Sequence, residues 1–498
     1  MARRRAVWVA TFALLGPLIR LALLPLAPPP SPVVHDEFVH LLEADTLLRG
    51  RLANPPHALP EFFETIYVIQ SPTYSASYPP GLGAFWAFGW WISGTPWAGV
   101  WLAMVLCCGA VTWMLYRWLP PRVAWTGGLL CSLTLGVSSY WMDSYFGAAT
   151  PAAGAALVFG ALPALLRTRR LRYAAILSVG WSLVWFTRPY ESLALGLLVA
   201  AVVLAALWKR RERRLLYATL LIGAVGALDF GGFCYQNWRV TGNPLFDPYR
   251  LTQRRYGVPH AFLWQHENPA PAHLTQQQRN VFEYQQTRFR QCRTLRGRLT
   301  ELGIDLKKDW FFYVGYGLTI PLALSLFSRG RARTLWLLLG LGIVWISLYP
   351  SVLVNYVSSA TCLCFALAAR GLFCLARWRK WGPALAVAFV TASCLAGLRE
   401  LYPRYLYGGP QPLTARIATE RRLEAMPGRH LVFVRYGPSH VLHDEWVYNR
   451  ADIDAAKVVW ANDLGADRDR ELIRYFKGRQ VWLAQPDDGA KLEPYDQP

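Results

Sequence analysis

Charged side chains are scarce in this sequence: only 17% of its 498 residues are Asp, Glu, Lys or Arg. A water-soluble protein usually carries about a quarter, so the shortage argues against a soluble enzyme. Acidic residues are the scarcer sign, with 31 against 52 basic residues and a net charge of +21. The basic residues separate long apolar runs instead of forming a patch, so no nucleic-acid partner is expected. The pattern is typical of a polytopic membrane protein with basic loops on one side.

Three motifs are also missing. The nine cysteines show no paired spacing and most lie inside apolar runs, so neither a disulfide framework nor a zinc site is predicted. No glycine-rich phosphate loop is visible, so nucleotide binding is not expected. No internal repeat of fixed period is present.

Apolar runs of about 20 residues can cross a bilayer. The first, residues 6–27, follows Arg3-Arg4-Arg5 and has no clear cleavage site, so it is expected to be a retained helix. A shorter run at 79–93 is expected to lie at or dip into the outer surface. Ten further spans are predicted at about 97–118, 122–139, 147–166, 173–187, 190–208, 215–235, 310–328, 333–349, 352–376 and 381–399.

The loops set the orientation, because cytoplasmic loops collect Lys and Arg. All five loops expected inside are basic, and the strongest is Lys209–Arg214. The fold predicted is therefore an all-α polytopic membrane protein with about eleven transmembrane helices and interfacial helices, its N-terminus cytoplasmic and its C-terminus extracytoplasmic. A small C-terminal α/β extracytoplasmic domain completes the chain.

The expected transmembrane domain covers residues 1–399, with outer loops at 28–96 and 236–309. Amphipathic helices lying on the membrane are expected in the second loop. Residues 400–498 are expected to form the small α/β domain, with strands at 430–434 and 481–484 and a helix at 467–477 between them.

The sharpest local signal is His35-Asp36-Glu37-Phe38, shortly after the first span. If a helix starts here, Asp36, His40 and Glu43 share one face by i, i+4, i+7 spacing, and apolar residues lie on the other. That arrangement would place a titratable row at the outer interface with its apolar side down. The alternative is that Asp36 only caps the helix N-terminus.

Three further segments carry candidate residues. Ser77–Gly81 contains Tyr78 before two prolines, which also fits a plain helix start. Asp143 lies in a short outer turn, where it could equally be solvated and idle. Arg188 and Glu191 lie between two apolar spans, and charges at that depth tend to be retained for a function, although a snorkelling pair without a role is the alternative.

Together these motifs resemble the C-type membrane glycosyltransferases. The closest likeness is to bacterial members related to protein O-mannosyltransferases and aminoarabinose transferases, which use polyprenyl-phosphate sugars. The resemblance rests on the order of the motifs and their predicted side of the membrane. It covers most of the chain, through His35–Gly81, Ser139–Gly147, Arg188–Glu191, Thr241–Pro244, Tyr256–Pro259 and Glu445–Asn449.

The resemblance implies roles for the candidates. Asp36 matches the general base and Glu37 a supporting residue, while Asp143 matches an acid that helps hold the acceptor or a metal, so a divalent cation is a possible cofactor. Relatives often carry a Lys near the position of Tyr78 that contacts the lipid phosphate. Because Tyr78 can supply only a weaker contact, further donors are expected, namely Arg188, Arg254 and Arg255. The remaining supporting residues are His35, His40, Glu43 and Glu191.

The function expected is an inverting glycosyltransferase of the bacterial inner membrane. It would move a sugar from a polyprenyl-phosphate donor to a hydroxyl of a glycan, lipid or protein acceptor on the outer face. The rival is a secondary transporter or a flippase of lipid-linked sugars, a class that tends to show paired repeats and mid-membrane sites. A catalytically silent scaffold is the third alternative.

Overall fold

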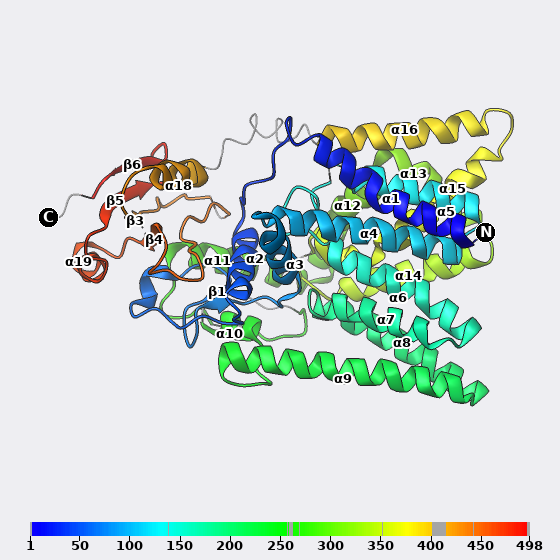
Figure 1. Ribbon diagram of the computed structural model, residues 1–498, viewed down its shortest axis with the longest axis horizontal. Helices are drawn as coiled ribbons and strands as arrows, with labels where there is room; N and C mark the ends of the chain where they lie inside the picture. The colour runs from blue at the N-terminus through cyan, green and yellow to red at the C-terminus, as the bar shows by residue number, and fades with distance from the viewer. Residues whose placement is uncertain are drawn as a thin grey trace. The chain divides into compact units, whose positions relative to one another are not determined.

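The computed structural model describes residues 2–137, 139–255, 257, 262–267, 269–350, 352–400, 415–441 and 443–495. Tyr256, Val258 and Pro259 of the motifs above lie outside these residues, as does the start of the predicted C-terminal domain at 401–414. The chain divides into two compact units (Figure 1). The helical unit comprises Met1–Pro29, Trp97–Gly232 and Gln291–Leu406, and the mixed unit comprises Pro30–Pro96, Phe233–Arg290 and Tyr407–Pro498.

Apolar helices make up the helical unit. Its elements are α1 (Ala2–Ala22), α4 (Trp97–Trp118), α5 (Pro121–Thr134), α6 (Ala149–Thr168), α7 (Leu171–Trp185), α8 (Pro189–Arg210), the start of α9 (Arg213–Thr241), α12 (Leu295–Tyr313), α13 (Gly315–Leu324), η2 (Ser325–Phe327), α14 (Arg331–Ile346), η3 (Val354–Ala360), α15 (Thr361–Ala376) and α16 (Gly382–Glu400). Small residues let the helices approach: a Cβ on Gly154 of α6 would lie 2.4 Å from the carbonyl oxygen of Gly180 in α7.

Six helices in the described part of the chain are long and apolar enough to cross a membrane: α1, α4, α6, α8, α9, and α15 together with η3. The bent pair α12 and α13 would make a seventh span. Each falls on or overlaps a predicted span. The predicted spans at α5, α7, α14 and α16 also form helices, but these do not reach the same length and hydropathy, so the total of eleven stays a prediction.

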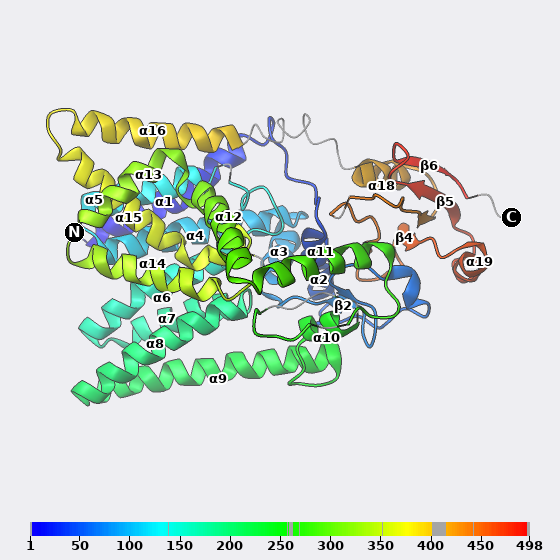
Figure 2. The same ribbon diagram turned by 180° about the vertical axis from the view of Figure 1, so that it is seen from behind.

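The predicted span at 310–328 is broken near its start and is not one continuous helix. The chain bends by 97° between α12 and α13 (Figure 2). At this break Gly315 takes a φ of 60°, in the left-handed region that glycine adopts at little cost. Helix α12 also begins at Leu295, inside the segment expected to be an outer loop, because the loop interpretation followed its polar composition.

The mixed unit contains a sheet with helices around it. Its elements are α2 (His35–Leu48), η1 (Pro60–Phe63), β1 (Val68–Ile69), β2 (Ser75–Ala76), α3 (Gly81–Ser93), the end of α9, α10 (Pro248–Arg255), most of α11 (Gln276–Cys292), α18 (Ala415–Ala425), β3 (His430–Val434), β4 (Val458–Asn462), α19 (Ala466–Tyr475), β5 (Gln480–Gln485) and β6 (Lys491–Pro494). The strand order is β4-β3-β5-β6, with β3 parallel to both neighbours and β6 antiparallel. Both predicted C-terminal strands and the helix between them are confirmed.

Helix α2 packs its apolar face into the core of the mixed unit. The Phe38 ring stacks on that of Tyr448, with 4.9 Å between ring centres, and the guanidinium of Arg416 lies 4.5 Å from the centre of the Phe38 ring. Leu42 belongs to the same buried cluster as Leu431 of β3. The expectation that this face points down onto the membrane is therefore wrong, because it is part of a buried core in which Tyr448 and Arg416 cover Phe38.

Helix α3 is the short helix expected at 79–93. Its glycine at position 83 packs directly on α2, whereas Phe88, Trp91 and Ile92 are exposed, Trp91 by 74%. The helix is therefore held by one face and leaves an apolar face uncovered within its unit.

Candidate active site

Glu37, and not Asp36, closes the start of α2. The N-cap residue is Val34, and the Glu37 carboxylate accepts hydrogen bonds from the backbone N–H groups of Val33 at 2.7 Å and Val34 at 3.2 Å. These contacts satisfy donors that a helix start leaves free. Asp36 therefore does not cap the N-terminus of α2.

The Asp36 carboxylate is held by two side chains. The Tyr78 hydroxyl donates to Oδ1 at 2.6 Å, and Nε2 of His35 lies 3.3 Å from Oδ2. The Asp36 side chain keeps 15% of its surface exposed. A carboxylate that is oriented but still reachable suits a group that must meet a substrate.

Tyr78 is itself fixed by neighbouring rings. Its ring centre lies 5.1 Å from that of His40, 5.3 Å from Tyr67 and 6.3 Å from Tyr249. Tyr67 has a φ of 60°, a conformation that is uncommon for a bulky residue and tends to occur at functional sites. The structure thus directs the Tyr78 hydroxyl to Asp36, whereas binding of a lipid phosphate by Tyr78 stays a prediction.

His40 and Glu43 continue the row along α2. Nδ1 of His40 lies 3.3 Å from Oε2 of Glu43, and the same oxygen accepts the N–H of Gly83 at 3.2 Å. A Cβ at position 83 would lie 2.4 Å from Cγ of Glu43, so only glycine permits this approach. Both side chains are buried within the mixed unit, and the position of the row at the outer interface stays a prediction. Burial raises the pKa of Glu43 well above its ordinary value, and the Gly83 N–H opposes this only in part.

His35 faces the centre of the mixed unit. Its ring lies 5.2 Å from that of Tyr67 and 5.1 Å from that of His443. Desolvation by burial lowers the pKa of His35, opposed by the nearby charge of Asp36. His35 is therefore a neutral neighbour of Asp36 at neutral pH.

Asp143 is engaged in a buried ion pair of the helical unit. Its Oδ1 lies 2.8 Å from Nη2 of Arg20, which is fully buried and also donates to the carbonyl oxygens of Ala27 at 2.8 Å and Pro28 at 3.3 Å. The Arg20 guanidinium lies 5.0 Å from the ring centre of Trp97. The alternative that Asp143 is a solvated loop residue without a partner is therefore wrong, since its ion pair fixes the end of α1.

The donor set fits a divalent cation poorly. The Asp143 carboxylate already binds a guanidinium, and the Asp36 carboxylate already accepts a hydroxyl. Within the described residues, neither unit gathers three His, Cys, Asp or Glu side chains that could hold a metal ion. We therefore assign no step to a metal.

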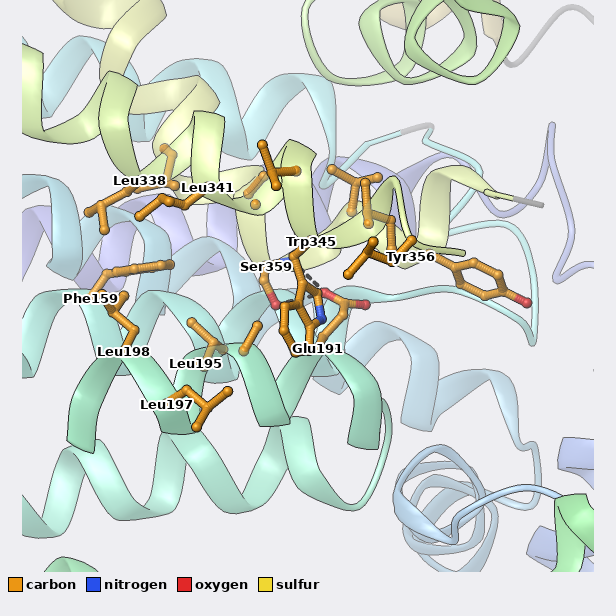
Figure 3. A pocket seen from close by; sticks show the side chains of 18 residues that line it. Phe159, Glu191, Leu195, Leu197, Leu198, Leu338, Leu341, Trp345, Tyr356 and Ser359 are labelled. Atoms are coloured by element: carbon orange, nitrogen blue, oxygen red, sulfur yellow. Dashed lines mark hydrogen bonds between the residues drawn. The ribbon is translucent and has the colours of Figure 1, made fainter. Parts of the chain in front are cut away.

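An apolar cavity of about 350 Å³ lies between α8, α14 and the η3–α15 segment of the helical unit. Figure 3 shows leucines and Phe159 along one side of Glu191 and Tyr356 on the other. The Glu191 carboxylate accepts hydrogen bonds from Ser358 Oγ at 3.0 Å, Ser359 N at 3.0 Å and Ser359 Oγ at 2.7 Å. The cavity thus combines hydrocarbon walls with one carboxylate whose hydrogen bonds come from η3.

Two arginines that interact with Tyr356 or Tyr190, near this cavity but not in its lining, have unused donors. Arg188 lies between the rings of Phe146 and Tyr356, 5.4 Å and 4.7 Å from their centres, and among the described residues its buried Nη2 has no hydrogen-bond partner. Arg298 of α12 acts electrostatically on Tyr190, and its three buried guanidinium nitrogens likewise have no partner in the described residues. Sequence reasoning missed Arg298 because it lies in the segment interpreted as a polar outer loop.

Arg254 and Arg255 are exposed at the end of α10 in the mixed unit. Nη1 of Arg255 donates to the Ser71 carbonyl at 2.8 Å, and Arg254 lies 5.0 Å from the ring centre of Phe246. Burial raises the pKa of Glu64 to about 7, and the charge of Arg255 opposes this shift.

The predicted site residues thus fall into two sets. The mixed unit brings together Asp36, Glu37, His35, His40, Glu43 and Tyr78 and also holds Arg254 and Arg255; the helical unit holds Asp143, Arg188 and Glu191.

No family model and no curated protein matches the sequence. The fold is similar to that of ArnT from Cupriavidus metallidurans in the apo state, with a TM-score of 0.54 and 13% identity over 96% of this chain and 93% of that chain. ArnT bound to undecaprenyl phosphate matches with a TM-score of 0.53 at the same identity and coverage. The oligosaccharyltransferase of Archaeoglobus fulgidus in complex with Zn and sulfate matches with a TM-score of 0.50 and 12% identity, over 96% of this chain and 67% of that chain.

One of these two ArnT structures holds undecaprenyl phosphate, and the archaeal protein is an oligosaccharyltransferase. The resemblance found in the sequence motifs is therefore confirmed at the level of the fold.

Proposed function

We propose that this protein is an inverting glycosyltransferase of the bacterial inner membrane. It takes a sugar from a polyprenyl-phosphate donor and transfers it to an acceptor hydroxyl on the outer face. The N-terminus is cytoplasmic and the C-terminus extracytoplasmic in this proposal, as the basic loops predict.

The observation that carries the proposal is the apolar cavity with free arginine donors beside it. Its volume of about 350 Å³ falls in the range of ligand pockets, and its walls suit a hydrocarbon chain. In the part of the chain that the structure describes, Arg188 and Arg298 have buried guanidinium nitrogens without a hydrogen-bond partner. A guanidinium matches a phosphate with two parallel hydrogen bonds. A lipid phosphate is a ligand that would use both features, as the likeness to ArnT bound to undecaprenyl phosphate supports.

Asp36 is the proposed general base. It accepts the proton of the acceptor hydroxyl as the hydroxyl oxygen bonds to the anomeric carbon of the sugar. The bond from that carbon to the phosphate oxygen breaks on the opposite face, and the electron pair leaves with the lipid phosphate. Tyr78 holds the Asp36 carboxylate through its hydroxyl at 2.6 Å.

Arg188 and Arg298 stabilise the phosphate as its charge develops. Fixed donors aimed at developing charge are often the largest catalytic contribution. An Arg188→Lys variant keeps the charge but loses the paired donors, so transfer should fall at least tenfold. A residue that merely snorkels would tolerate the change.

Binding of the donor lipid tests the proposal. The purified protein is titrated with undecaprenyl phosphate and analysed by native mass spectrometry, comparing wild type with Arg188→Lys, Arg298→Lys and, as the matched control, Arg254→Lys. We expect both helical-unit variants to bind at least tenfold more weakly and the control to bind normally. Loss of binding in Arg254→Lys alone would move the phosphate site to α10.

A second assay separates transfer from transport. Proteoliposomes are given a labelled polyprenyl-phosphate sugar, and both sugar transferred to an acceptor extract and lipid moved across the bilayer are counted. Transfer without net lipid movement supports the proposal, whereas movement without transfer would establish the flippase.

A further inference from the structure

A basic cavity lies at the opposite end of α1 from the Arg20–Asp143 pair. It has a volume of about 460 Å³ and is lined by Arg4, Arg5, Trp8, Tyr116, Pro121, Arg122, Trp125 and Thr126. These residues come from the start of α1, the last turn of α4 and the first two turns of α5. From Arg4 to Arg20, α1 rises by about 24 Å, which approaches the thickness of the hydrocarbon core of a bilayer.

The positive charges of the three arginines in this cavity are not balanced by an acidic side chain of the described residues. No acidic side chain lines the cavity, and within the described part of the chain Arg4, Arg5 and Arg122 have no ion-pair partner. Other arginines of the helical unit are engaged: Arg169 pairs with Glu212 at 2.8 Å, and Arg331 donates to the Trp118 carbonyl at 3.0 Å.

A helix N-terminus adds to the positive potential. Helix α5 starts at Pro121, its N-cap residue is Pro120, and no side chain caps it. Since Pro121 has no N–H and that of Ala124 donates to the Pro120 carbonyl, the uncapped groups of the first turn are the N–H groups of Arg122 and Val123. They face the same end of the bundle as the arginines, and a helix N-terminus favours an anion.

Aromatic rings line the cavity on its apolar side. Trp8 and Trp125 pack edge to face with 5.7 Å between ring centres, and Trp8 is 39% exposed. Tryptophan and tyrosine concentrate where a membrane protein meets the headgroup level of the bilayer. A ligand here would meet both guanidinium groups and aromatic surface.

We propose that this cavity binds the phosphodiester headgroup of an anionic phospholipid in the leaflet opposite the outer face. The phosphate oxygens accept from Arg4, Arg5 and Arg122, and the glycerol and first acyl carbons lie against Trp8 and Trp125. Basic pockets between membrane helices on the cytoplasmic side are suited to anionic lipids. The site is independent of the donor-lipid cavity beside Arg188, with which it shares no lining residue.

Native mass spectrometry of the full-length protein tests the site with three probes: dioleoyl phosphatidylglycerol, dioleoyl phosphatidylcholine and inorganic phosphate. The test variant carries Arg4→Gln, Arg5→Gln and Arg122→Gln. The control carries Arg211→Gln, Arg213→Gln and Arg214→Gln, which removes equal charge from exposed positions on the same predicted side. We expect phosphatidylglycerol to remain bound to the wild type and to the control. Its binding to the test variant should be at least tenfold weaker.

A further variant guards against misinsertion, because removing basic residues can change membrane orientation. Replacing the same three arginines with lysine keeps the charge and removes the paired donors, so phosphatidylglycerol should bind several-fold more weakly. Equal retention of phosphatidylcholine, binding of inorganic phosphate alone, or equal loss in the control would each overturn the proposal. So would unchanged binding in both the glutamine and the lysine variants.

Discussion

The two aspartates at the centre of the sequence prediction have opposite environments. Asp143 in the helical unit is bound to Arg20, whose guanidinium is fully buried and also donates to two backbone carbonyls. Asp36 in the mixed unit is bound by a tyrosine hydroxyl and keeps part of its surface exposed. A carboxylate that forms an ion pair with a buried cation stabilises a fold. A carboxylate that is oriented by a neutral hydrogen-bond donor remains available to a substrate. The comparison therefore predicts a structural role for Asp143 and a chemical role for Asp36, and the variants below test both.

Removing the Asp143 carboxylate should have the largest effect, and that effect should be on stability. Asp143→Ala leaves the Arg20 guanidinium buried without its charge partner, which typically costs about 3–5 kcal/mol. We expect a large drop in the thermal midpoint in detergent. Arg20→Met with Asp143→Leu removes both charges and should recover much of the loss. Stability unchanged in Asp143→Ala, with transfer abolished, would instead restore Asp143 to the reaction.

Asp36→Asn should leave stability intact and abolish function. Asn cannot accept a proton, so transfer should fall at least about a hundredfold, the scale of a lost general base. Undecaprenyl phosphate should still bind, as native mass spectrometry can check. Wild-type transfer by this variant would remove Asp36 from the mechanism.

Tyr78→Phe sharpens the comparison, since it removes only the donor that orients Asp36. If Tyr78 positions the base, kcat should fall by roughly 10- to 150-fold, because a hydrogen bond to a charged group contributes about 1.5–3 kcal/mol. The KM for the lipid donor should stay the same. If Tyr78 instead binds the lipid phosphate, as its place in the sequence first suggested, KM should rise. Steady-state kinetics with varied donor distinguishes the two results.

Glu43→Gln should give the smallest effect, visible as a change in pH dependence. The pKa of Glu43 is raised in the folded state, so its contribution to stability is complete below the unfolded value of about 4.3 and is lost as pH rises toward the folded value. Wild-type stability should therefore decline through this window by at most about 1.4 kcal/mol per pH unit, and the variant should lack this decline. Unfolding measured from pH 5 to 8 tests this, with the exposed Glu283→Gln as a control that should follow wild type.

Long apolar runs in the sequence predicted most helices of the helical unit. Helix α4 occupies the predicted span at 97–118, and α3 is the expected short helix, because an apolar run of given length has few alternatives in or beside a bilayer. The 97° bend at Gly315 was missed, since a single glycine in an apolar run is tolerated in many straight helices. Strand β4 was also missed: Val458–Asn462 is five buried residues without alternation.

Local spacing predicted part of the candidate site. The i, i+4, i+7 spacing placed His40 next to Glu43, and the structure has this contact. The Tyr78–Asp36 hydrogen bond joins residues 42 positions apart, and the Arg20–Asp143 pair joins residues 123 positions apart. Such partners depend on how the elements pack, which no local pattern records.

The missing side chain at Gly83 also has a mechanical consequence. Because the Glu43 carboxyl fills the space where a Cβ would be, α3 cannot slide along α2 without breaking the contact to the Gly83 N–H. The two helices should therefore move together. The exposed Phe88, Trp91 and Ile92 belong to α3, and the His40–Glu43 row belongs to α2. A force that lipid exerts on the exposed apolar face of α3 would therefore be transmitted to α2, which carries Asp36, the proposed base.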